Sequence, residues 1–210
     1  MTTPGLIVPP TPPDRLSERF AQLITSDPLL MSLLRRLNHV SHPAFSGSWR
    51  LVAGCLYQAV WNDLAGEPLE RGVNDYDVAY FDPGDLSYEA EDQVIREVAG
   101  LVAPLNIPVE VRNQARVHLW FGDHFGVDIA PHASVEHAID CYAAQTHKVG
   151  VRLTRDDQID IYAPDRALEY IYAMRLVPNA TLANRTTYER KALRCKTLWP
   201  SLQIEPWPTV

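Results

Sequence analysis

Apolar side chains near the start of the chain recur every three or four residues, a spacing that predicts amphipathic helices. Thr11 and Asp14 have the spacing of a capping box, so a first helix is expected over roughly 12–25. Asp27-Pro28 begins a second helix, whose apolar face is formed by Leu29, Leu30, Leu33, Leu34, Leu37 and Val40. The first forty residues therefore predict two helices that each bury one face.

The middle of the chain alternates short apolar runs with helical segments. In IPVEVR (107–112) the valines alternate with Glu110 and Arg112, which predicts a half-buried strand with these two charged side chains turned away from the core. The elements expected before this strand are a strand in WRLVAG (49–54), a helix in CLYQAVWNDLAG (55–66), a strand over 75–81 and a helix over about 87–103. This order predicts a sheet with helices packed against it.

The last ninety residues predict more strands and then helices. RVHLWF (116–121), VGVRLT (149–154) and IDIYA (159–163) are strand candidates, the last two as a hairpin. Asp165 is expected to cap a helix in ALEYIYAMRL, and Thr186 with Glu189 has capping-box spacing before a final helix in RKALRCKTLW. The predicted fold class is α+β, a mixed sheet flanked by helices, with helical segments at both ends.

One domain accounts for almost the whole chain. Five of the first thirteen residues are proline, so 1–12 is expected to be an extended arm. The rest, 13–210, is expected to be a single domain. It is expected to begin with helices over 13–42, to continue with a central sheet over about 49–163, and to end with helices over 165–199. A chain of 210 residues with 46% hydrophobic residues is long enough to bury a substantial core.

Composition limits the partners and the compartment. No run approaches the roughly 20 apolar residues of a membrane span, and the first residues lack a signal-peptide pattern, so no membrane partner and a cytoplasmic location are expected. The formal charge is −7, from 26 acidic and 19 basic residues, which disfavours a long nucleic acid as partner. The three cysteines are far apart in sequence, so neither a disulfide framework nor a cysteine zinc site is predicted.

The sequence NDYDVAYF (74–81) places two acidic residues at the start of an apolar strand. Side chains of an extended strand alternate between faces, so Asp75 and Asp77 point the same way. Two carboxylates side by side repel each other, and a divalent cation would turn that repulsion into attraction. The alternative for this pair is a solvated strand end.

Three features now combine: the strand–helix turn at Gly54-Cys55, the aspartate strand, and a later strand with the outward Glu110. This order resembles the nucleotidyltransferase superfamily, and AGCLYQAVWNDLAG, NDYDVAYFD, VEVRNQARVHLWFG and THKVGVR together resemble an uncharacterised bacterial branch of it. The resemblance runs from about Trp49 to the last helix. It implies transfer of a nucleoside monophosphate from a nucleoside triphosphate, such as ATP, to an acceptor.

The resemblance also implies residue roles. Asp75, Asp77 and Glu110 would be catalytic and would hold Mg²⁺ or Mn²⁺, since hard carboxylate oxygens suit two-metal phosphoryl chemistry. The backbone at Gly54 and Cys55 would meet phosphates. Arg112, Asn113, Arg116 and His118 are the remaining substrate-binding candidates. The alternatives are a tight turn at Gly54, a core position for Cys55 or His118, and a turn at Asn113.

The acceptor stays open between a small molecule, a nucleotide and a protein. A catalytically inactive nucleotide-binding or protein-binding module is the main alternative, because Cys55 stands where many active members carry Ser or Gly. A DxD glycosyltransferase or a toxin–antitoxin component would be further alternatives. His132 and His137 are expected at the surface, and Arg190, Lys191 and Arg194 are expected to form a solvated helix face.

Overall fold

The computed structural model describes residues 13–46, 48–164, 166–180 and 184–209. The predicted arm over 1–12, the cap at Thr11 and the cap at Asp165 lie outside these residues. Within the described residues, no helix is both long and apolar enough to cross a lipid bilayer.

A five-stranded mixed sheet forms the centre of the molecule. Its strands are β1 (Trp49–Val52), β2 (Tyr76–Tyr80), β3 (Val109–Asn113), β4 (Gly150–Leu153) and β5 (Ile159–Tyr162). Their spatial order is β3-β2-β1-β4-β5. The β2–β3 pair is parallel and the other pairs are antiparallel. The predicted mixed sheet and the predicted β4–β5 hairpin are therefore confirmed.

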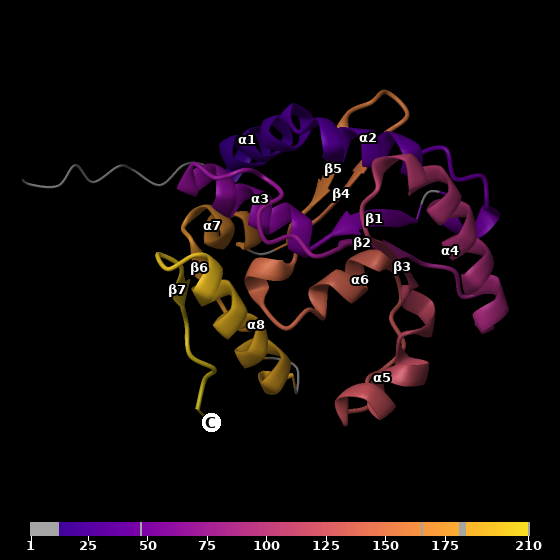
Figure 1. Cartoon of the computed structure of the whole chain (residues 1–210). Coiled ribbons are helices and arrows are strands. Elements are labelled where there is room, and N and C mark those ends of the chain that lie inside the picture. The colour runs from indigo at the N-terminus through magenta and orange to yellow at the C-terminus, as the bar shows by residue number, and fades with distance from the viewer. Residues whose placement is uncertain (1–12, 47, 165, 181–183, 210) are drawn as a thin grey trace, which may run out of the picture.

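Helices cover both faces of this sheet. The longer ones are α1 (Pro13–Ser26), α2 (Pro28–Leu37), α3 (Gly54–Ala65), α4 (Tyr88–Val102), α5 (His118–Phe125) and α8 (Arg185–Leu198), and the shorter ones are α6 (Val135–Asp140) and α7 (Ala167–Tyr172). Single 3₁₀ turns lie at Pro43–Phe45, Ala103–Leu105, Gln114–Arg116 and Gln145–His147. A small parallel pair, β6 (Arg175–Leu176) and β7 (Gln203–Ile204), follows α7 and α8. Figure 1 shows α1 and α2 above the sheet and α5, α6 and α8 below it.

The start of the chain packs as its periodicity predicts. The Asp27 carboxylate accepts hydrogen bonds from the amides of Leu29 and Leu30, at 2.8 and 3.2 Å, and so caps α2. Leu33 and Leu34 of this helix are fully buried. Burying one aliphatic face of each helix stabilises this layer against the sheet.

Buried hydrogen bonds attach the last helix to the body of the domain. The indole N–H of Trp199, at the end of α8, donates to Oδ1 of Asn62 on α3 at 2.9 Å. Asn62 in turn donates to the carbonyls of Leu69 and Arg71, and the indole of Trp61 donates to the carbonyl of Ile171. These contacts fix α8 next to α3, so the basic side chains of α8 have a defined position relative to the sheet.

A buried arginine holds α6 against the lower face of the sheet. Arg50 of β1 is 6% exposed and pairs with Glu136 of α6 at 2.8 Å and with Asp160 of β5 at 3.2 Å. At Gly150 on the neighbouring strand, a Cβ atom would lie 2.9 Å from Ile139 Cδ1 and 3.1 Å from Arg50 Cδ. Glycine at this position therefore allows β4, Arg50 and α6 to approach one another closely.

Three local expectations are wrong. RVHLWF does not form a strand: Asn113 accepts a hydrogen bond from the Ala115 amide, the chain turns, and α5 follows until Gly126 ends it with φ 74°. The final helix begins at Arg185, so Thr186 lies inside its first turn, and Glu189 pairs with Arg185 at 2.7 Å. The helix in ALEYIYAMRL ends at Tyr172, because its last residues join β6.

Candidate active site

Two of the predicted carboxylates lie side by side on the parallel strands β2 and β3. Asp77 pairs with Glu110 in the strand register, so their side chains project from the same face of the sheet. Asp75 lies two residues before Asp77, immediately ahead of β2. The charge of Asp75 and that of Glu110 both act on Asp77. The fold thus brings together three acids that come from two separate segments of the chain.

The pKa of Asp77 is raised by its burial and by the two neighbouring acids. Burial, and after it the neighbouring charges of Asp75 and Glu110, raise the pKa of Asp77 from 3.8 to about 6, although Lys191 and Arg112 oppose the rise. Loss of hydration and like charge both disfavour the ionised carboxylate. A divalent cation would relieve both effects, so the donor set suits a hard metal ion.

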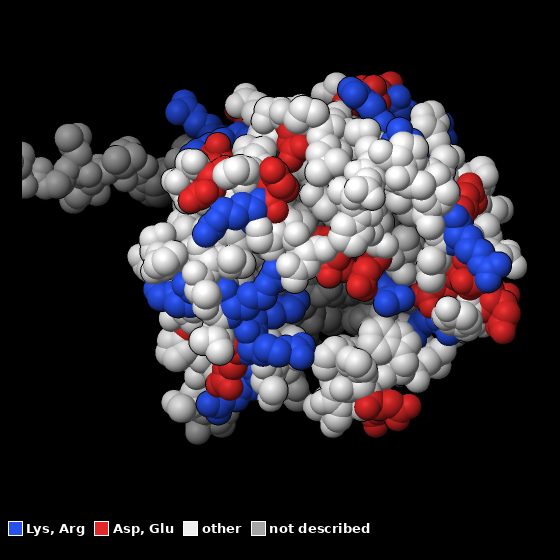
Figure 2. Space-filling model, in the orientation of Figure 1, with Lys and Arg blue, Asp and Glu red and all other residues white. Residues whose placement is uncertain are grey.

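A cavity of about 190 Å³ opens beside these acids. Its polar lining includes Asp77, Glu110, Arg112, Gln114, His147 and Lys191, and its apolar lining includes Val52, Ala53, Val117, Trp120 and Tyr142. Figure 2 shows a hollow with acidic side chains at its edge and lysine or arginine side chains on either side. This arrangement could hold a cation and a polyanion together.

The turn between β1 and α3 lies against the same cavity. Ala53 has φ 52° and ψ −107°, a left-handed conformation that costs a non-glycine residue of order 1–3 kcal/mol. Its amide donates to the Val149 carbonyl at 2.9 Å, and its carbonyl accepts from Leu56 at 3.0 Å. Within the described residues no side chain caps the first turn of α3, so the amides of Gly54 and Cys55 can donate hydrogen bonds to an anion.

The backbone of Gly54 and Cys55 forms that first turn, but the Cys55 side chain points into the core. Its thiol is 2% exposed and donates to the Val52 carbonyl at 3.9 Å. Burial raises the pKa of Cys55, and the charge of Asp77 raises it further. Cys55 is therefore a neutral, buried thiol, and only its amide could contact a ligand.

The four substrate-binding candidates from the sequence separate in the structure. Arg112 lines the cavity and lies 3.4 Å from Glu110. Arg116 is instead paired with the buried Glu91 of α4. The Asn113 side chain is buried and bonded to the backbone of Asp82 at 3.0 and 2.8 Å. His118 begins α5, and its Nδ1 is buried without a hydrogen-bond partner among the described residues.

Among the lining residues that the sequence did not single out for the site, three have side chains suited to binding a substrate. Lys191 lies on α8, whose basic residues were expected to be a solvated face. Trp120 lies on the helix that was expected to be a strand, and its ring is 36% exposed. His147 is buried and stacked on Tyr57, with ring centroids 4.6 Å apart. Only the tertiary structure distinguishes Lys191 from its neighbours on the same helix.

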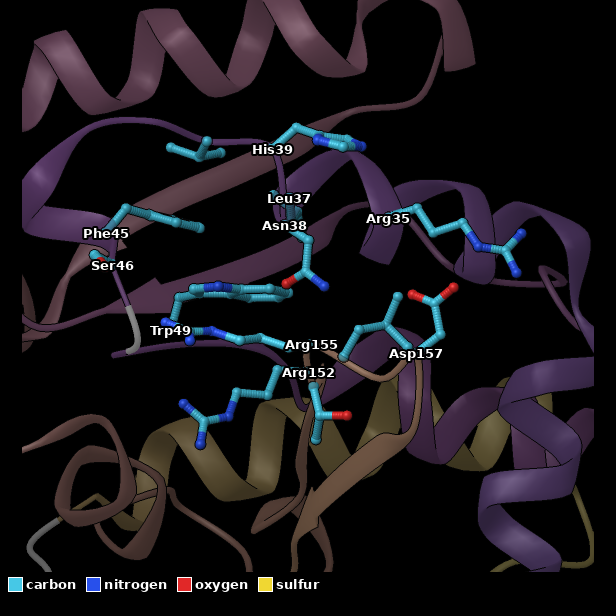
Figure 3. A pocket seen from close by; sticks show the side chains of 13 residues that line it. Arg35, Leu37, Asn38, His39, Phe45, Ser46, Trp49, Arg152, Arg155 and Asp157 are labelled. Atoms are coloured by element: carbon cyan, nitrogen blue, oxygen red, sulfur yellow. The ribbon is translucent and has the colours of Figure 1, made fainter.

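A larger cavity lies elsewhere among the described residues, at the opposite end of β1 and β4. It measures about 770 Å³ and is lined by Trp49, Phe45 and several polar residues, among them Arg35, Arg152 and Arg155. The Trp49 ring is stacked on Phe45, with ring centroids 5.4 Å apart, and Figure 3 shows Arg152 and Arg155 on the other side of Trp49 in this view. Asp157 is the acidic residue of its lining, so this cavity lacks the paired carboxylates of the smaller one.

The mixed sheet, the paired carboxylates and the adjoining strand–helix turn define the nucleotidyltransferase class of fold. A family model described as nucleotidyltransferase matches residues 47–204, and the chain belongs to that family. A solved structure described as a CCA-adding enzyme head domain matches with a TM-score of 0.70 at 22% identity, over 90% of this chain and 95% of that chain. This likeness confirms the fold.

A second solved structure is more distant. It is the Bacillus stearothermophilus CCA-adding enzyme in complex with CTP, which matches with a TM-score of 0.41 at 14% identity over 86% of this chain and 42% of that chain. No curated protein matches this chain. Family membership supports a role in nucleotidyl transfer, and the resemblance predicted from the sequence is confirmed.

Proposed function

We propose that this chain is a metal-dependent enzyme that transfers a nucleoside monophosphate from a nucleoside triphosphate to an acceptor. The register that places Asp77 opposite Glu110, with the charge of Asp75 acting on the same carboxylate, is the observation that carries this proposal. The charges of Asp75 and Glu110 disfavour the ionised form of Asp77, a cost that a non-catalytic binding module has no evident reason to maintain.

The three acids would hold Mg²⁺ or Mn²⁺. When bound, such ions would neutralise the triphosphate and the developing charge of an in-line displacement. Within the described residues, Asp75, Asp77 and Glu110 do not form a closed group of metal ligands. Glu110 is half exposed and paired with Arg112, so it can turn toward Asp77 without disturbing the core.

Other residues of the cavity would orient the substrates. Lys191 and Arg112 would neutralise phosphate oxygens, and the uncapped amides at the start of α3 would donate hydrogen bonds to a phosphate. The exposed ring of Trp120 is suited to stacking on a nucleobase. The acceptor oxygen would attack the α-phosphorus, pyrophosphate would leave, and Glu110 would be placed to take the acceptor proton.

Calorimetric titration with each of the four nucleoside triphosphates, with and without Mg²⁺ or Mn²⁺, tests the proposal. Binding that requires the metal and disappears in Asp75→Ala/Asp77→Ala is expected. Glu18→Ala/Asp156→Ala is the matched control, since it removes two exposed carboxylates elsewhere. Binding that persists in the first variant, or no binding to the native protein, would contradict the proposed site.

Release of pyrophosphate separates an enzyme from a binding module. Turnover of labelled triphosphate in the presence of candidate acceptors is expected for the native protein and not for the aspartate variant. Tight, metal-dependent binding without any pyrophosphate release would favour the non-catalytic module. Preference for a sugar nucleotide over the triphosphates would favour the glycosyltransferase alternative.

A further inference from the structure

A second group of potential metal ligands lies beside the carboxylate cavity. One ring nitrogen from His132, one from His137 and the Cys141 sulfur all lie within 4.8 Å of one another. His132 precedes α6, His137 lies within it, and Cys141 follows its last residue. His137 and Cys141 are four residues apart, which places them on the same side of the helix. The sequence expectation that both histidines are surface residues is therefore wrong for His132, which is 9% exposed.

One buried nitrogen of this group has no hydrogen-bond partner among the described residues. Nδ1 of His132 is buried and has no hydrogen-bond partner among the described residues, and the same is true of Nδ1 of His118. The rings of His132 and His137 are 5.4 Å apart and nearly perpendicular, at 89°. A buried, unpaired imidazole nitrogen is costly, and a metal ion is one of the few groups that satisfies several of them at once.

We propose that His132, His137 and Cys141 bind Zn²⁺. Two imidazole nitrogens and one thiolate are the donor set of a zinc site, whereas Mg²⁺ selects carboxylate oxygens. The fourth position would be taken by water or by His118, whose buried Nδ1 also has no hydrogen-bond partner among the described residues. This site is independent of the three carboxylates and of the proposed reaction.

The geometry requires a small closure. Bonds to zinc of about 2.0–2.3 Å place the ligand atoms of a tetrahedral site roughly 3.3–3.8 Å apart, so the three side chains would move together by about 1 Å. The Ala133 amide donates to Nδ1 of His137 at 3.0 Å, and zinc bound at this nitrogen would replace that hydrogen bond. A single neutral hydrogen bond is weak beside a metal–nitrogen bond.

The surroundings leave room for an ion to enter. The two histidines and Cys141 line a cavity of about 440 Å³, together with apolar residues such as Phe121 and Ile129. The cavity shares Gln114, Val117 and Tyr142 with the carboxylate cavity. A bound zinc ion would fix a wall common to both.

Titration of the metal-stripped full chain with Zn²⁺ and with Co²⁺ tests this proposal. We expect one equivalent of zinc to bind, a sulfur-to-cobalt charge-transfer band with Co²⁺, and a higher midpoint of thermal unfolding with zinc. His132→Ala and Cys141→Ser should each weaken zinc binding by more than about 100-fold, since loss of an outer-shell partner alone costs 10–100-fold. Circular dichroism of the metal-free variants checks that they fold.

Two controls make the result specific. His124→Ala removes an exposed histidine of α5 and should leave zinc binding unchanged. Asp75→Ala/Asp77→Ala should also retain the zinc equivalent, so the zinc site and the proposed catalytic site can fail separately. Zinc that does not bind, that binds equally to the His132 and Cys141 variants, or that is lost with the two aspartates would overturn the proposal.

Discussion

Replacing Asp77 by asparagine is expected to stabilise the metal-free protein while it removes a proposed metal ligand. Burial and the charges of Asp75 and Glu110 raise the pKa of Asp77 from 3.8 to about 6. A difference of about 2 in pKa between the unfolded and folded chains corresponds to about 3 kcal/mol. Because the Asp77 side chain keeps some contact with solvent, we expect a smaller gain in the free energy of unfolding, about 1–2 kcal/mol at pH 7.5.

The pH dependence has a defined sign. The folded protein holds the Asp77 proton to a higher pH than the unfolded chain does, so the native protein loses stability as the pH rises from about 4 through about 6. The advantage of Asp77→Asn should therefore be largest at pH 7.5 and should shrink toward pH 4.5. Saturating Mg²⁺ should stabilise the native protein and not the variant.

Urea unfolding followed by tryptophan fluorescence, in EDTA and at both pH values, measures this effect. Asp156→Asn, an exposed aspartate in the β4–β5 hairpin, is the matched control and should change the free energy of unfolding by less than roughly 0.5 kcal/mol. The reasoning is refuted if Asp77→Asn is no more stable than the native protein at pH 7.5, or if its advantage is the same at pH 4.5.

Three further variants test individual contacts. Lys191→Ala should weaken triphosphate binding about tenfold in calorimetry, because a charge-assisted contact is lost. Arg190→Ala should leave binding unchanged, since Arg190 is exposed on the same helix and does not line the cavity. Equal losses in the two variants would contradict the role assigned to Lys191. Burial lowers the pKa of His147, so below pH 6.5 the unfolded chain takes up a proton that the folded chain excludes. The free energy of unfolding should therefore fall as the pH is lowered below 6.5, by up to about 1.4 kcal/mol per pH unit. His147→Phe should flatten this slope in urea titrations, and an unchanged slope would assign it to other groups. Glu91→Gln should lower the free energy of unfolding in urea by about 3 kcal/mol, because Arg116 would keep a buried charge without its partner. Triphosphate binding should persist in this variant. A decrease of less than about 1 kcal/mol would mean that water reaches the ion pair.

The sequence by itself determined the features that depend on local period. Alternation along an extended strand was enough to place Asp75 and Asp77 on one side and to turn Glu110 outward, and the structure pairs Asp77 with Glu110 on neighbouring strands. Helical period and the Asp27 cap predicted α2 in the same way. Such patterns act between residues a few positions apart, so they can be recognised along the chain.

The tertiary structure alone decided which partners meet across the chain. Arg112 and Arg116 have the same charge and are four residues apart, yet the first lines the cavity and the second pairs with Glu91. Lys191 enters the site because α8 is attached to α3 through Trp199, which no local pattern encodes. His132 and His137 were expected at the surface, yet the fold brings a ring nitrogen of each within 4.8 Å of the other, although His132 precedes α6 and His137 lies within it. Long-range packing and burial determine these choices, since the energy of a charged or polar side chain depends on which groups surround it in the folded chain.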